Sequence, residues 1–181
     1  MEQILAADAP EREGPPPAPR VMEERVNFII DSILKDVITR GTGRKALVLE
    51  RSDIAGKTGT TNGPMDAWFS GYNQEVVTTT WVGFDNYTPL GRREFGGTAA
   101  LPIWIEFMAA ALKGRKQTER QLPAGIVNVR INPETGKLAA AGQNNAIFEY
   151  FREENVPQRD LREDDGPGDG TATDELIRGI F

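Results

Sequence analysis

Two neighbouring segments rich in aromatic and β-branched residues constrain the fold most strongly. They are "DAWFSGY" (66–72) and "VVTTTWVGF" (76–84), and only "NQE" separates them. Such residues favour strands, and a short polar link favours a tight reversal, so the pattern predicts an antiparallel hairpin. A third strand is expected at 56–61, and the apolar run at 46–50 is a further candidate strand.

Two helices are expected beside these strands. Apolar residues at helical spacing predict the first over 21–40, ended by Gly41 as a C-cap. The residues of this apolar stripe are Met22, Val26, Ile29, Ile30, Ile33 and Val37. The second helix is predicted over 102–113, and it is apolar nearly all round, so we expect it to be buried.

The remaining segments suggest how the chain is divided. Residues 1–20 are rich in proline and are expected to form a linker or surface loop, while 21–113 hold the main strands and helices. Residues 114–151 are expected to form a C-terminal β-hairpin extension. Within it, alternating apolar residues precede a Pro-Glu-Thr-Gly turn: Val127, Val129 and Ile131. Residues 152–181 carry nine acidic side chains and four arginines, and we expect an acidic, disordered tail.

Composition excludes several kinds of site. The chain has no cysteine and no histidine, which rules out disulfides, thiolate metal sites and a Ser-His-Asp triad. We expect neither a metal nor a cofactor. A net charge of −6 argues against a nucleic-acid partner. The apolar run Leu101 to Leu112 is short of the roughly twenty residues that span a bilayer, and the first residues do not resemble a targeting signal.

The Gly-Lys-Thr at 56–58 has two incompatible interpretations. A phosphate-binding loop needs G-x-x-x-x-G-K-[ST] followed by a helix. Arg51 stands where the first glycine belongs, and the following "GTTNGPMD" is unsuited to begin a helix. The earlier "GTGRK" at 41–45 is shorter still. Nucleotide binding is therefore disfavoured.

The alternative interpretation is a strand that binds a carboxylate. Such a site needs a cation, small hydroxyl donors and a glycine that leaves room for the ligand. Residues 57–61 supply these parts as Lys57, Thr58, Gly59, Thr60 and Thr61. On a strand, Lys57 and Gly59 share one face while Thr58 and Thr60 share the other.

Four blocks in order make this interpretation specific. They are "AGKTGTTN", "DAWFSGY", "VTTTWVGFDN" and "PLGRREFGGTAALPIWIEFM". Together they resemble the C-terminal part of the transpeptidase domain of class A, bifunctional penicillin-binding proteins. The resemblance covers about residues 19–151 and includes the late block "VRINPETGKLAA". It implies an α+β fold of the penicillin-binding-protein/β-lactamase type, with a five-stranded antiparallel sheet packed on helices. The fold would be incomplete in this chain, which would hold three of the strands.

The resemblance also implies a function. Members of the family are serine D,D-transpeptidases or carboxypeptidases that cross-link peptidoglycan stem peptides and are acylated by β-lactams. The parent protein would lie at the periplasmic face of the bacterial inner membrane and carry a glycosyltransferase domain. Of the family's motifs S-x-x-K, S-x-N and K-T-G, the last is matched at 57–59. By that match, Lys57, Thr58, Gly59 and Thr60 are catalytic-site residues, and Thr58, Thr60 and Thr61 bind the substrate. The Thr60 N–H would be an oxyanion donor.

The family's nucleophile is not evident before Lys57. "SILK", Ser32 to Lys35, fits the letters S-x-x-K, but both residues fall mid-helix on the side opposite the apolar stripe. This pattern predicts a solvated helix surface. No S-x-N precedes Lys57, because "SDI" at Ser52 has Ile54 where asparagine belongs. We therefore expect the chain to be a C-terminal fragment that lacks the nucleophilic serine and is inactive alone.

Other interpretations stay open beside this one. The same strands could form a non-catalytic binding or structural module. Asp66 is expected to be a strand-start or turn residue, and three tryptophans are expected in the core: Trp68, Trp81 and Trp104. The pair Arg92 and Arg93 fits an anionic ligand as well as it fits plain solvated charge.

Overall fold

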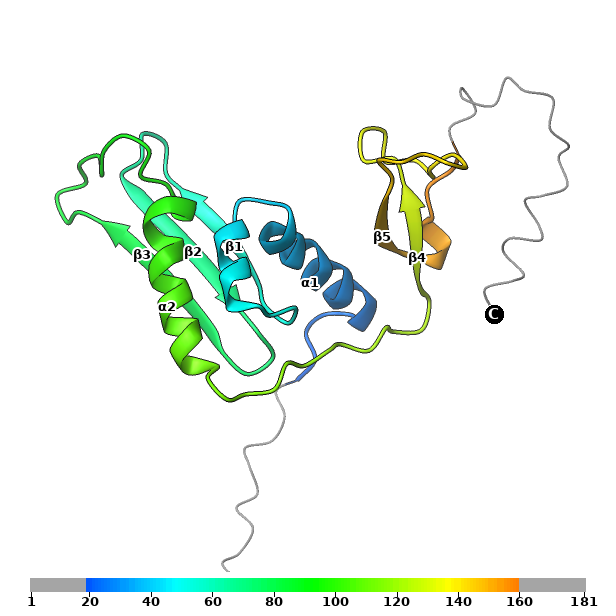
Figure 1. The fold of residues 1–181 in the computed structure, drawn as a ribbon, viewed down its shortest axis with the longest axis horizontal. Coiled ribbons are helices and arrows are strands. Elements are labelled where there is room, and N and C mark those ends of the chain that lie inside the picture. The colour runs from blue at the N-terminus through cyan, green and yellow to red at the C-terminus, as the bar shows by residue number, and fades with distance from the viewer. Residues whose placement is uncertain (1–18, 160–181) are drawn as a thin grey trace, which may run out of the picture.

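The computed structural model describes residues 19–159, which form a three-stranded sheet with two helices and a separate two-stranded hairpin (Figure 1). The sheet has the order β1-β2-β3, and both pairs of neighbours are antiparallel. Its strands are β1 (Ala55–Thr60), β2 (Asp66–Tyr72) and β3 (Val77–Gly83). The three strands predicted from the sequence are confirmed to within one residue at each end.

The two helices occupy different places around the sheet. Helix α1 (Glu24–Thr39) contacts β1, and α2 (Leu101–Ala111) lies across one face of the sheet (Figure 1). A wide helical turn, η2 (Gly96–Ala100), leads into α2 and packs on β2. Pro102 is the second residue of α2, where its missing N–H costs no helical hydrogen bond. The α+β prediction is confirmed.

The hydrophobic core lies between α2 and the sheet. Its largest fully buried side chains are Trp104, Phe69, Ile38, Ile54, Leu101 and Met108. The rings of Phe69 and Trp104 meet edge to face, with centroids 4.9 Å apart. A Cβ on Gly71 would lie 2.5 Å from the Trp104 indole, so this strand position has to be glycine for the ring to lie so close. The prediction that Trp104 is a core residue is confirmed.

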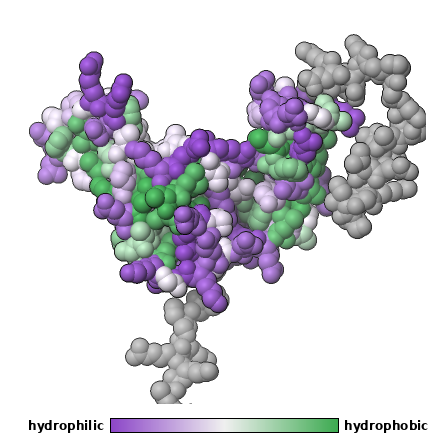
Figure 2. Space-filling model, viewed as in Figure 1, coloured by the Kyte–Doolittle hydropathy of each residue, from purple (hydrophilic) through white to green (hydrophobic). Residues whose placement is uncertain are grey.

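One side of α2 remains exposed. Ile103 and Phe107 are 51% and 50% exposed, so the prediction that α2 is buried all round is wrong on this side. The 3-10 helix η1 (Arg44–Leu49) contacts α2, and its Leu47 and Val48 are exposed too. Figure 2 shows a hydrophobic area over η1 and the adjoining side of α2. Within the described chain only one face of the helix meets the sheet.

The strand expected at 46–50 is also wrong, because these residues belong to η1. Its turns are closed by short-range bonds, from Ala46 N–H to the Gly43 carbonyl and from Glu50 N–H to the Leu47 carbonyl. Only Ala46 is buried, while Glu50 ends the element in a left-handed conformation with φ of 52°. An apolar run this short does not distinguish a strand from a helical turn.

Helix α1 turns a different face inward from the one predicted. Ile30 and Ile33 are 40% and 56% exposed, whereas Asp31 and Ile38 are buried. The Asp31 carboxylate accepts a hydrogen bond from the Tyr72 hydroxyl at 3.0 Å, which offsets the cost of burying it. Burial, together with the nearby Asp31 charge, raises the pKa of Tyr72 to about 12.

The second hairpin forms with a different partner from the one expected. Strand β4 (Ile126–Ile131) pairs with β5 (Ile147–Arg152). The residues after the Pro-Glu-Thr-Gly turn add only the single bridge between Ile131 and Leu138. The turn does form, with Gly136 at φ of 69°, but β5 offers β4 six consecutive paired residues. Strand β4 therefore pairs with the distant β5, which forms the longer ladder, and not with the residues directly after the turn.

The acidic segment is ordered at its start. Residues Glu153–Asn155 form the short helix η3, and Arg159 bridges to Leu138, so the prediction of disorder from residue 152 is wrong for 152–159. The remainder of that tail and the first 18 residues of the proline-rich segment lie outside the described residues.

The hairpin docks on α1 through one aromatic contact and several ion pairs. Phe28 and Tyr150 meet edge to face with ring centroids 5.0 Å apart. The ion pairs are Arg25–Glu154, Arg152–Glu23 and Arg40–Glu149, all with N–O distances of 3.0 Å or less. A connector (residues 112–125) leads from α2 to this hairpin (Figure 1). No helix among residues 19–159 is long and apolar enough to span a membrane.

Candidate functional site

The predicted site residues lie on an edge strand of the sheet. In the ladder Lys57 faces Ser70, and Gly59 faces Trp68 on β2. The other edge of β1 has no strand beside it among residues 19–159. An extended ligand could therefore pair with β1 as an added strand.

Ladder geometry shows which backbone groups point to this edge. The Thr61 N–H donates to the Asp66 carbonyl, so residues 61, 59 and 57 direct their backbone groups at β2. Because these groups alternate along an antiparallel strand, the N–H groups of Thr58 and Thr60 point away from β2. The backbone donor assigned to Thr60 thus lies on the open side of the sheet.

The Lys57 ammonium group lies beside the hydroxyl of the next residue. Its Nζ donates to the Thr58 carbonyl at 2.9 Å and lies 3.5 Å from Thr58 Oγ1. Lys57 is exposed and Thr58 is partly buried. The structure therefore brings a cation and a hydroxyl group together on one strand.

The other two threonines hold backbone donors. Thr60 Oγ1 accepts a hydrogen bond from the Gly96 N–H at 3.1 Å. Thr61 Oγ1 accepts two, from the N–H groups of Met65 and Asp66, at 3.2 and 2.9 Å. A hydroxyl has two acceptor sites and one proton, so each of these side chains still has its proton to donate.

Tryptophans cover part of the face that carries Lys57. Trp68 and Trp81 are 41% and 44% exposed, with ring centroids 6.1 Å apart, so the prediction that they are core residues is wrong. Their strand positions turn them away from α2, which covers only the Phe69 face. Asp66 begins β2 as expected, and its carboxylate also accepts the Trp81 indole N–H at 2.8 Å.

The loop after β3 carries the two arginines considered as ligand contacts. Arg92 and Arg93 are both exposed. Arg93 has φ of 67°, and its carbonyl accepts a hydrogen bond from Thr98 Oγ1 at 2.7 Å. Their role as ligand contacts stays a prediction.

Ser32 and Lys35 are partly buried, so the prediction of a solvated surface is wrong for both. Lys35 Nζ lies 3.2 Å from the buried Asp31 carboxylate, which holds the ammonium group in a structural ion pair. This contact gives Lys35 a structural role as the ion partner of a buried carboxylate.

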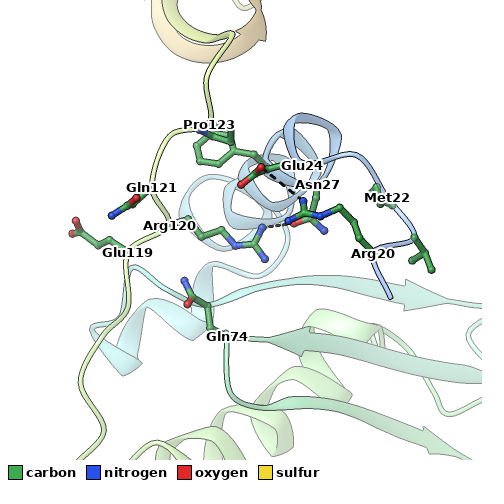
Figure 3. Close-up of a pocket in the computed structure, with 11 residues that line it drawn as sticks. Arg20, Met22, Glu24, Asn27, Gln74, Glu119, Arg120, Gln121 and Pro123 are labelled. Carbon is green, nitrogen blue, oxygen red and sulfur yellow. Dashed lines mark hydrogen bonds and ion pairs between the residues drawn. The ribbon is translucent and has the colours of Figure 1, made fainter. Parts of the chain in front are cut away.

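One cavity lies away from these residues. It has a volume of about 720 Å³ and is lined by the start of α1, Gln74 and the connector. Figure 3 shows Arg120 reaching from the connector toward Asn27 on α1. In the ladder Gln74 follows the Tyr72 end of β2, whereas Thr60 lies at the opposite end of β1. This cavity is therefore not the site built on Lys57.

The described residues contain no cluster of three or more acidic side chains that could hold a metal ion. The phosphate-loop interpretation of Gly-Lys-Thr, which the sequence disfavours, does not fit the structure, because these residues lie inside β1 and the next element is the strand β2 and not a helix. Sequence reasoning missed one contact of the site: Thr42 Oγ1 lies 2.8 Å from Thr58 Oγ1. The glycines on both sides of Thr42 were the available signal.

Comparisons with known proteins point in one direction. No family model matches the chain. It is 54% identical over 155 residues to Penicillin-binding protein 1A of Pseudomonas aeruginosa, covering 86% of this chain and 19% of that protein. It is 48% identical over 110 residues to Penicillin-binding protein 1A of Neisseria lactamica, covering 61% of this chain and 14% of that protein. The chain thus spans a fifth or less of the length of these relatives.

A solved structure shares the fold. Penicillin-Binding Protein 1A from Haemophilus influenzae matches with a TM-score of 0.70 and 39% identity, covering 78% of this chain and 22% of that one. The antiparallel sheet and its helices are therefore part of a transpeptidase-like α+β fold, as the resemblance implied.

Proposed function

The chain is a segment of a class A penicillin-binding protein, and from this premise we propose that β1 is the carboxylate-binding strand of a serine D,D-transpeptidase that cross-links peptidoglycan. One observation carries the proposal: Lys57 and the hydroxyls of Thr58 and Thr60 lie on a strand whose outer edge pairs with no other strand among residues 19–159. The proposal concerns the parent protein.

The reaction uses these groups in a defined way. A stem peptide that ends in a free carboxylate lies along the open edge of β1. Lys57 supplies the positive charge, and the hydroxyls of Thr58, Thr60 and Thr61 donate to the carboxylate. A serine attacks the penultimate D-Ala carbonyl, and the terminal D-Ala leaves; an amine of a second peptide then takes the acyl group and frees the serine.

The Thr60 N–H has a separate role in this scheme. As the carbonyl becomes tetrahedral, its oxygen gains negative charge, and a donor fixed in advance stabilises it. One such donor contributes about 3–4 kcal/mol where it has been removed. Gly59, the residue before Thr60, has a packing role: a Cβ there would lie 3.2 Å from the Trp68 Cβ, a tight contact that glycine avoids. A β-lactam carries its own carboxylate and occupies the same place.

The nucleophile and its lysine would come from residues outside this chain. Lys35 is held by Asp31, and this contact supports treating Ser32 as a bystander. The parent would act at the periplasmic face of the bacterial inner membrane and carry a glycosyltransferase domain. The isolated 181-residue chain would be inactive.

A non-catalytic docking module is the second candidate. The apolar surface of Ile103 and Phe107 on α2 and Val48 on η1 favours it, since monomers seldom expose such contiguous areas without a partner. This candidate predicts that the isolated chain unfolds cooperatively and binds a protein partner. It also predicts that substituting Lys57 leaves the rate of acylation by penicillin unchanged.

Substituting Lys57 tests the first candidate. The protein to use is full-length Pseudomonas aeruginosa Penicillin-binding protein 1A with residues 19–159 of this chain replacing its matching segment. Lys57→Ala should slow acylation by penicillin about 10–100-fold, because hydrogen bonds to charged groups are worth about 1.5–3 kcal/mol. Lys45→Ala, at an exposed position of η1, is the matched control and should leave the rate unchanged. Equal rates for all three proteins would refute the role assigned to β1.

A further inference from the structure

Thr42 contacts the proposed carboxylate site from outside its strand. It lies in the loop between α1 and η1, sixteen residues before Thr58, and its Oγ1 is 2.8 Å from Thr58 Oγ1. Either hydroxyl could donate in this bond. Thr42 itself is exposed, so the pair lies where a ligand could reach it.

The loop around Thr42 is held by close packing. A Cβ on Gly41 would lie 2.8 Å from the Val37 Cα, and one on Gly43 would lie 2.9 Å from Ile38 Cδ1. The Gly43 N–H also donates to the Val37 carbonyl at 2.8 Å. The two glycines thus let the loop fold back on the last turn of α1, and the position of Thr42 is fixed with it.

The opposite side of the loop is enclosed as well. The Thr42 carbonyl lies 3.0 Å from where a Cβ on Gly97 would be, and Thr58 Cγ2 lies 3.8 Å from the same point. Three elements therefore meet at Thr58: the loop after α1, the strand β1 and the turn η2. Thr42 is the residue that brings a hydroxyl to this meeting point.

The neighbouring threonines indicate which direction of this hydrogen bond would leave Thr58 a proton for a ligand. Thr60 and Thr61 accept from backbone N–H groups and keep their protons to donate. Thr58 Oγ1 contacts side chains instead of backbone N–H groups. Lys57 Nζ, which can only donate, lies 3.5 Å from Thr58 Oγ1, and Thr42 Oγ1 lies 2.8 Å from it. If Thr42 donates too, the acceptor sites of Thr58 are filled and its own proton is left for an anion.

We propose that Thr42 is a positioning residue that donates to Thr58 Oγ1 and thereby directs the Thr58 proton at the carboxylate of the bound substrate or β-lactam. This inference rests on the proposed function of β1. It deepens that function by assigning a role to the Gly-Thr-Gly loop at residues 41–43. The effect should appear only with ligands that carry a negative charge.

The test compares two forms of one β-lactam. In the full-length chimeric protein described above, acylation rates are measured for benzylpenicillin and for its methyl ester, which lacks the charge. Thr42→Val should slow acylation by benzylpenicillin about tenfold, as expected if the Thr58 hydroxyl no longer donates to the charged carboxylate, and should leave the rate for the ester unchanged. Thr42→Ser, which keeps the hydroxyl, should restore the rate for benzylpenicillin.

A matched control separates this role from a general loss of packing. Thr39 ends α1 three residues away, and its hydroxyl donates to the partly buried Asp36 carboxylate at 3.2 Å and not to a residue of β1, so Thr39→Val should change neither rate. If Thr42→Val slows both compounds equally, or slows neither, the assignment is wrong. If acylation is normal in every Thr42 variant but lost in Lys57→Ala, the role of Thr42 is rejected and the proposed function of β1 stands. Absence of acylation in the unsubstituted chimera would overturn both.

Discussion

At the scale of single residues, short side chains decide how closely the parts of the site approach. Lys57 and Thr58 could be placed on a strand from the sequence, because the motif is local and its neighbours are typical of strands. The hydrogen bond between Thr42 and Thr58 could not be predicted from the sequence, because it joins two segments whose approach depends on the path of a loop. The burial of Asp31 was missed for the same reason: its partner Tyr72 lies 41 residues away.

Gly71 offers a stability test at this scale. A Cβ there would lie 2.5 Å from the buried Trp104 ring, so Gly71→Ala should lower the free energy of unfolding by about 1–3 kcal/mol, the usual cost of overpacking. Ser70→Ala, one residue earlier on the exposed face of β2, is the control and should change it by less than about 1 kcal/mol. Urea denaturation measures both. Equal stability of the two variants would mean that Trp104 does not lie against Gly71.

At the scale of elements, the sequence predicted the strands of the main sheet well and the lesser elements poorly. Strands β2 and β3 are long and rich in β-branched and aromatic residues, so their pattern is strong. The segment at 44–49 is short, and the partner of β4 depends on which later segment can form the longer ladder. Neither choice is encoded locally.

The docking of the hairpin on α1 should depend on one aromatic contact more than on its ion pairs. Phe28→Ala removes the edge-to-face contact with Tyr150 and should increase hydrogen exchange in β4 and β5 by about tenfold, in line with a loss of 1–2 kcal/mol. Arg25→Ala breaks an exposed pair with Glu154 and should have a smaller effect, since such pairs contribute about 0–1 kcal/mol. The reverse order would show that charge holds the hairpin in place.

The stability of the fold should fall in acid because of Asp53, whose carboxylate binds the connector at Thr118. Burial raises the pKa of the Asp53 carboxyl, but hydrogen bonds from Arg51 and Thr118 outweigh it, so the pKa lies below its usual value. A lowered carboxyl pKa stabilises the fold above the unfolded value of about 3.9 and ceases to do so as the pH falls through the folded value.

Asp53→Asn should therefore destabilise the chain at pH 7, by about 3–5 kcal/mol if Arg51 is left without its charge partner. The variant should also lose part of its dependence on pH below about 4. Thermal unfolding between pH 2.5 and 7 measures both effects, and Glu134→Gln, at an exposed position in the turn after β4, serves as control. An unchanged acid limb in Asp53→Asn would rule out this carboxylate as its source.

At the scale of the whole molecule, the described chain leaves some surfaces uncovered. Ile30 and Ile33 on α1 and Ile103 and Phe107 on α2 are exposed, and so are Trp68 and Trp81 on the face of the sheet opposite α2. The sequence pattern treated all these side chains as core. Periodicity identifies which residues suit burial, and it cannot tell whether the covering element belongs to the same stretch of chain.

The most direct test is to map penicillin adducts on two proteins: the purified 181-residue chain and the full-length chimera that contains residues 19–159. Intact mass and peptide mapping should show no adduct on the chain alone and one adduct on the chimera, at a serine outside the grafted segment. That result would place the nucleophile elsewhere and leave β1 as the carboxylate-binding strand. An adduct on Ser32, or on any other serine of the isolated chain, would contradict the account, because the chain would then carry a complete site of its own.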